Sequence, residues 1–126
     1  MRIATLIVRS LLGLVFTIFG LNGFLHFIPN QPMPAAAGQF FGALFATGYM
    51  IPLIFTTQVI GGILLLIGVF VPFALVILAP IIVNIFFFHL FLAPGGVPVA
   101  IVVVVFELFL AWRHSAAFAP LFATAG

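Results

Sequence analysis

The glutamate Glu107 is the first candidate for chemistry in this chain, because it is the only acidic residue among 126. It lies within the apolar run from Val97 to Trp112. An isolated carboxylate in hydrocarbon is unfavourable by on the order of several kcal/mol, so a glutamate in such a run is neutral, paired or functional. We therefore take Glu107 as the candidate catalytic residue, able to exchange protons with a bound ligand.

Polar side chains recur in the other apolar segments and form a second candidate set, which consists of Asn22, His26, Gln58, Asn84 and His89. At about 1.5 Å per helical residue, the three amides and Glu107 lie about 9 to 15 Å from the outer ends of their segments. An amide that faces lipid has no hydrogen-bond partner, so we expect the helices to bring these groups into one polar layer in the outer half, which binds a ligand such as a quinone head group. The alternative is that the amides only join helices by hydrogen bonds.

The two histidines of this set lie nearer the surface than the amides. Solvated histidines at the membrane interface are one interpretation. A b-type haem held by His26 and His89 is another, since the two lie at similar depth on different segments. On a straight helix His89 points about 140° away from Asn84, which argues against a site shared by these two residues.

The composition defines the class of protein that must position these residues. Hydrophobic residues make up 67% of the chain and charged residues 3%, against roughly 45–50% apolar residues in a soluble domain. No water-soluble surface can be built from this composition. No polar low-complexity stretch separates two parts of the chain, so we predict a single transmembrane four-helix domain over residues 1–126.

Proline and glycine divide the chain into four apolar segments, each close to the roughly 20 residues that span a bilayer as a helix. They run from about Ile3 to Ile28, Met50 to Phe70, Pro72 to Leu92 and Val97 to Arg113. Helices satisfy their own backbone hydrogen bonds in lipid. We predict an all-α membrane protein, with four transmembrane helices in an antiparallel bundle and a short interfacial helix, from Ala35 to Thr47, between the first and the second.

The charged residues predict how the chain lies in the membrane. Arg2 and Arg9 stand at the start of the first segment and Arg113 at the end of the fourth, whereas the loops on the opposite side carry no charge. The positive-inside rule then predicts both termini in the cytoplasm, for a protein of the bacterial inner membrane whose first segment is an uncleaved span. Three arginines are too few to bind the phosphate backbone of a nucleic acid, and we expect them to be too scattered to form a basic patch.

The chain has no cysteine, which excludes disulfides, thiolate metal sites and a dithiol relay of its own. No metal site is predicted. Gly13, Thr17, Gly20 and Gly23 form a stripe of small residues on one face of the first segment, as at close helix contacts in membranes. We predict that this stripe, or the segment of Phe40 and Phe41, contacts a partner membrane protein or a second copy of the chain.

Four stretches together resemble the DoxX family: GLVFTIFGLNGFLHF, TTQVIGGILLLIG, APIIVNIFFFHLFL and FELFLAWRHSAAFAPLF. The resemblance implies a four-helix integral membrane protein linked to quinone or thiol redox metabolism. It also implies that Gln58 stands where family members often carry a glutamate, so a titratable group is lost there.

Three functions follow as hypotheses. The first is a non-catalytic accessory subunit packed against a larger, respiratory or other redox, membrane complex. The second is a quinone-linked redox subunit that binds a quinone head group in the polar layer, with Glu107 or His89 exchanging protons. The third is the b-type haem binder. Quinone is the cofactor that the resemblance implies.

Overall fold

The computed structural model describes residues 2–29 and 32–124, and every regular element in these ranges is helical. The elements in chain order are α1 (Arg2–Leu25), α2 (Ala35–Ala46), α3 (Met50–Ile67), α4 (Val71–Phe91), η1 (Pro94–Gly96), α5 (Val97–Arg113), α6 (Ser115–Phe118) and η2 (Ala119–Phe122). Four of them, α1, α3, α4 and α5, are long and apolar enough to cross a membrane. The prediction of an all-α protein with four spans and a shorter helix between the first two is confirmed.

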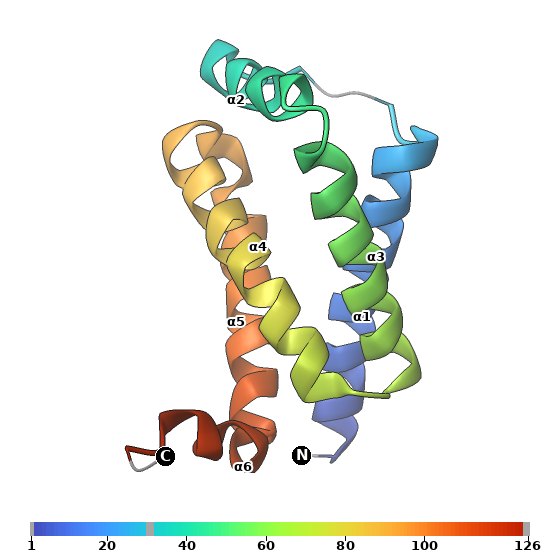
Figure 1. Ribbon diagram of the computed structural model, residues 1–126, viewed down its shortest axis with the longest axis vertical. Coiled ribbons are helices and arrows are strands. Elements are labelled where there is room, and N and C mark those ends of the chain that lie inside the picture. Colours follow the sequence, from blue (N-terminus) through green and yellow to red (C-terminus); the bar gives the residue numbers. More distant parts are fainter. Residues whose placement is uncertain (1, 30–31, 125–126) are drawn as a thin grey trace.

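The four long helices form an antiparallel bundle of two pairs (Figure 1). α1 packs along α3 and α4 along α5, while α3 also contacts α4 and α1 also contacts α5. The short helix α2 lies across one end of the bundle, here named the outer end. The start of α1, the end of α5 and the helix α6 lie at the opposite end, named the inner end. The arginines of both terminal spans are therefore at one end of the molecule.

The first span ends earlier than its hydrophobicity predicts. α1 stops at Leu25 because His26 adopts the left-handed conformation, with φ of 53°. The side-chain oxygen of Asn22 then accepts a hydrogen bond from the backbone N–H of Ile28 at 2.7 Å. This bond satisfies a backbone group that the helix end would leave without a partner.

The second span also ends earlier than predicted, at Ile67 instead of Phe70. α3 ends at Ile67 because Gly68 has φ of 75°, a conformation that glycine adopts without steric conflict. Its N–H donates to the carbonyl of Leu64 at 2.9 Å. Phe70, with φ of 52°, then precedes the first residue of α4, Val71.

The stripe of small residues on α1 packs against α3 within the chain. A Cβ added at Gly13 would lie 2.8 Å from the carbonyl oxygen of Gly62, and one added at Gly20 would lie 2.7 Å from a methyl carbon of Val59. Backbones approach this closely only where side chains are absent. The stripe is thus used inside the bundle, and the prediction that this surface contacts another chain is wrong.

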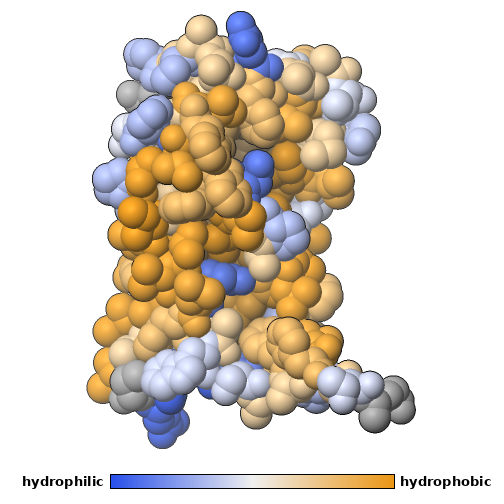
Figure 2. Space-filling model, turned by 90° about the vertical axis from the view of Figure 1, so that its left-hand side faces the viewer, coloured by the Kyte–Doolittle hydropathy of each residue, from blue (hydrophilic) through white to orange (hydrophobic). Residues whose placement is uncertain are grey.

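The core lies between the four long helices, while the outward surface is apolar. The buried residues of the core include Leu12, Phe16, Leu65, Leu75, Leu78, Ile82, Val103 and Leu110. Many large hydrophobic side chains are exposed along the spans, among them Phe87 and Phe91 of α4. Figure 2 shows hydrophobic residues over the middle of one face and more hydrophilic residues toward both ends. This distribution suits a protein surrounded by lipid.

Candidate functional site

Three of the predicted polar residues line one small cavity at the outer end. This outer cavity, of about 150 Å³, lies between α3 and α4 beneath α2, and its polar lining residues are Gln58, Asn84 and His89. Gln58 is buried, with 7% of its surface exposed, whereas Asn84 is exposed at the edge of the cavity. The antiparallel packing of α3 on α4 brings the two amides to similar heights, as their depths in the sequence predict.

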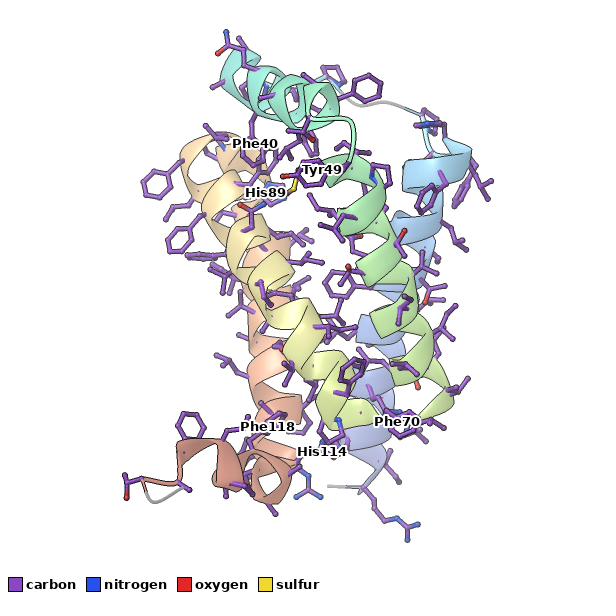
Figure 3. All side chains as sticks on the ribbon, in the orientation of Figure 1. Phe40, Tyr49, Phe70, His89, His114 and Phe118 are labelled. Atoms are coloured by element: carbon purple, nitrogen blue, oxygen red, sulfur yellow. The ribbon has the colours of Figure 1, made fainter. Side chains whose placement is uncertain are left out.

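The helix α2 closes the outer cavity through aromatic contacts. The ring of Phe88 on α4 lies 5.7 Å from that of Phe40 and 5.1 Å from that of Phe41. Figure 3 shows Phe40, Tyr49 and His89 gathered at the outer end. The alternative surface predicted for a partner chain, around Phe40 and Phe41, therefore packs at least partly on the bundle itself.

Asn84 and His89 line the same cavity, so the prediction from helical angles that they share no site is wrong. Five residues of α4 line the outer cavity: Ile81, Asn84, Ile85, Phe88 and His89. They cover a broad face, with Asn84 and His89 at its two edges. Nδ1 of His89 lies 3.3 Å from the carbonyl oxygen of Ala93. A carbonyl only accepts hydrogen bonds, so Nδ1 is the nitrogen that donates there.

Asn22 and His26 do not line the outer cavity. The side-chain oxygen of Asn22 accepts the N–H of Ile28, so it has a structural role at the end of α1. His26 is exposed in the turn that follows. His26 is absent from the lining of the outer cavity that His89 lines. An axial pair for haem needs both histidines on one cavity.

Glu107 lines a different and larger cavity in the inner half of the bundle. This inner cavity, of about 590 Å³, is bounded by α4, α5, α6 and η2. Its walls are mostly apolar, and its lining residues are Leu75, Val76, Ala79, Ile82, Val83, Val104, Glu107, Leu108, Ala111, Trp112, Ser115, Phe118, Ala119, Leu121 and Phe122. The volume falls in the range of roughly 300–1,000 Å³ that is typical of small-molecule sites.

The carboxyl group of Glu107 lies well inside the protein. The residue is 8% exposed, and its Oε1 is buried without a hydrogen-bond partner among the described residues. Glu107 lies about 9 Å from the end of α5 at Arg113 and about 15 Å from its start. The nearer end is the inner one, so Glu107 does not join Gln58 and Asn84 in an outer layer. The position of a residue along its own helix does not show which neighbouring helix its side chain faces.

Several residues that line the inner cavity were not among the predicted site residues. Trp112, Ser115 and Phe118 come from the end of α5 and from α6. Figure 3 places Phe118 on α6 at the inner end. The sequence offers one signal for them, because Phe118, Leu121 and Phe122 place apolar side chains soon after the fourth span, where they can lie along the inner surface.

The two cavities differ in the chemistry they allow. The outer cavity offers two amides and an imidazole, but little volume. The inner cavity offers a single carboxyl group, the hydroxyl of Ser115 and aromatic rings, in a larger space. Within the parts that the structure describes, no group of three or more His, Cys, Asp or Glu residues lies together as metal ligands would.

One family model matches this chain. The model, described as DoxX, matches residues 4–90, from the third residue of α1 to the next-to-last residue of α4. The helix α5 with Glu107 lies beyond the matched segment. No curated protein and no solved structure matches the chain.

Proposed function

The chain belongs to the DoxX family of membrane proteins, and from this premise we propose that it is a quinone-binding subunit of a redox-linked membrane complex. The head group is proposed to occupy the inner cavity, with Glu107 as its polar partner. This assignment moves the proposed ligand from the outer polar residues to the cavity that has the volume to hold it.

The observation that carries the proposal is the buried Oε1 of Glu107, which has no hydrogen-bond partner among the described residues. A buried polar atom left in this way is unfavourable by about 1–3 kcal/mol. A ligand that bonds to this atom removes the penalty. In its protonated form the carboxyl group donates to a quinone carbonyl, and in its ionised form it accepts from a quinol hydroxyl. Glu107 is thus suited to hold or release a proton at the head group.

The walls of the inner cavity also fit such a ligand. A quinone supplies two-electron, two-proton redox chemistry from a planar ring that carries an apolar tail. Trp112, Phe118 and Phe122 offer aromatic surface for the ring. Val83 and Leu108 line the cavity and are 54% and 62% exposed on the lipid-facing side. The cavity therefore reaches the lipid-facing surface, through which a tail extends into the bilayer.

The role of a subunit within a larger complex rests on what the chain itself contains. The chain has no cysteine, so a dithiol that delivers electrons has to belong to another protein. Most of the described residues lie in the four spans, and the short elements outside them offer little aqueous surface for a second substrate. An accessory subunit that supplies the quinone pocket, while a partner supplies the electrons, agrees with both features.

The distribution of arginine supports an orientation for this subunit. Arg2, Arg9 and Arg113 lie on α1 and α5 at the inner end, and no charged residue lies in α2 or the loops of the outer end. We infer from the positive-inside rule that the inner end faces the cytoplasm of a bacterial inner membrane. Tagging each terminus with a reporter that is active in one compartment only tests this inference, and a periplasmic signal from either terminus contradicts it.

The fluorescence of Trp112 tests the proposed quinone site. It is the only tryptophan of the chain, and it lines the inner cavity. Titration of the purified protein with a short-chain ubiquinone analogue is expected to quench its emission in a saturable manner. Glu107→Gln should weaken the saturable component, whereas the control Asn84→Ala, in the outer cavity, should leave it unchanged. Linear quenching equal to that of free indole in the same detergent would refute the proposal.

A further inference from the structure

All three arginines of the chain gather around one depression at the inner end. The depression, of about 700 Å³, is lined by Arg2 and Arg9 of α1 and by Arg113 and His114 at the end of α5, together with Thr5 and the apolar Ile3 and Leu6. It shares no lining residue with the inner cavity of Glu107. The packing of α1 against α5 therefore creates a cationic surface from residues at opposite ends of the sequence, and the prediction that the arginines are too scattered to form a basic patch is wrong.

The groups around this depression are held in place by contacts within the chain. Nε of Arg113 donates a hydrogen bond to Oγ1 of Thr5 at 3.0 Å, across 108 positions of the sequence. Nδ1 of His114 lies 2.9 Å from the carbonyl oxygen of Leu110 and donates to it. The second ring nitrogen of His114 and the terminal N–H groups of Arg113 are not used by these two bonds.

Arg9 carries the more informative observation. Its guanidinium group packs against Gly68, at the end of α3, where a side chain would collide with it. Its Nε is buried and has no hydrogen-bond partner among the described residues. The only acidic side chain of the chain, Glu107, lines the other cavity. The three guanidinium charges thus have no carboxylate side chain of their own protein to neutralise them.

We propose that this depression binds the phosphate group of an anionic lipid head group. Guanidinium groups match phosphate through paired hydrogen bonds, and the contacts that hold Arg9 and Arg113 lower the entropy lost on binding. Ile3 and Leu6 flank the depression and are 74% and 52% exposed, which suits contact with acyl chains. A free phosphate ion would make no contact with the apolar side chains of Ile3 and Leu6. We therefore assign the phosphate to a lipid, whose acyl chains make that contact.

Native mass spectrometry of the full chain tests the proposal. The protein is released from micelles that contain equal amounts of phosphatidylglycerol and phosphatidylcholine with the same acyl chains. We expect retained phosphatidylglycerol to exceed phosphatidylcholine. Replacing one arginine, in Arg9→Gln or Arg113→Gln, should lower this preference about fivefold, since each cation near a lipid surface contributes roughly that factor. The control His26→Gln, at the outer end, should keep it.

Two outcomes would overturn the proposal. One is equal retention of the two lipids by the native chain. The other is a thermal stabilisation by inorganic phosphate, at constant ionic strength, together with no lipid preference, which would assign the depression to a soluble anion. Because Arg9→Gln removes packing on Gly68, its circular dichroism is compared with that of the native chain. The exposed Arg113→Gln supplies the same test with less risk to the fold.

Discussion

Gly62 of α3 faces Thr17 of α1 so closely that a Cβ added at Gly62 would lie 2.6 Å from both the backbone nitrogen and Oγ1 of Thr17. The hydroxyl group of Thr17 donates to the carbonyl of Gly13 on its own helix at 2.7 Å. The two backbones therefore meet with only the hydroxyl group of Thr17 beside the contact. This contact joins the first pair of helices and fixes the position of α1, from which two arginines of the cationic depression project.

Gly62→Val should destabilise the bundle, because the new side chain meets the backbone of α1 rather than a flexible group. Overpacking of this kind lowers the free energy of unfolding by about 1–3 kcal/mol. The transition in mixed micelles of rising dodecyl sulfate content measures the change. Gly42→Ala on α2 is the control, since a Cβ there meets nothing within 4 Å. Equal transitions for the two variants would show that α1 and α3 do not meet as described.

Glu107→Leu should stabilise the protein while removing its response to quinone. The substitution eliminates a buried oxygen without a described partner, so we expect the free energy of unfolding to rise by about 1–3 kcal/mol. Thermal unfolding with and without the ubiquinone analogue measures both effects. Substitutions at binding sites often raise stability while they lower function. A lower unfolding temperature would indicate that Glu107 has a structural hydrogen bond instead.

Asn22→Ala should affect stability alone. The variant loses the hydrogen bond from the N–H of Ile28 to the side-chain oxygen, and a helix-terminal bond of this type contributes about 1 kcal/mol. Quinone quenching of Trp112 should remain as in the native chain. Hydrogen exchange at Ile28 should become faster, which a role of Asn22 in a ligand site would not predict. Slow exchange in the variant would argue against the described end of α1.

Phe70→Gly should raise the unfolding temperature. Phe70 adopts φ of 52°, which is unfavourable by roughly 1 kcal/mol for a residue with a Cβ, and its side chain is 71% exposed, so little packing is lost. Val69→Gly is the matched control, because Val69 has no positive φ and glycine there only increases the freedom of the unfolded chain. A stabilising effect of the control, or none of Phe70→Gly, would contradict the described turn.

The four spans and the all-α class were predictable because they depend on local properties of the chain. A helix in lipid needs only a sufficient run of apolar residues, and the backbone then bonds within the segment. The ends of the spans were less accurate. His26 and Phe70 adopt the left-handed conformation without being glycine, so nothing in their residue type indicated that the helices end or begin beside them.

The candidate site was predictable in part. Gln58 and Asn84 lie on consecutive spans at similar depths, and a short antiparallel connection suffices to bring them to one cavity. Glu107 could be recognised as unusual from its residue type alone. The cavity that Glu107 lines could not be predicted. The angle at which α5 packs on its neighbours also decides which helix a given position faces, and the sequence does not show this angle.

The sequence by itself therefore determined the number of membrane spans, their antiparallel order and the end of the molecule that carries positive charge. Only the tertiary structure decided that Glu107 lies apart from Asn84, that the stripe of Gly13 is covered by α3, and that Arg9 meets Arg113 at one depression. The reason is that the same apolar residue types occur on the lipid-facing side of a helix and on the side that faces the core. Hydrophobic patterning then gives no indication of the inward face of a helix, and close packing and a few polar contacts select it.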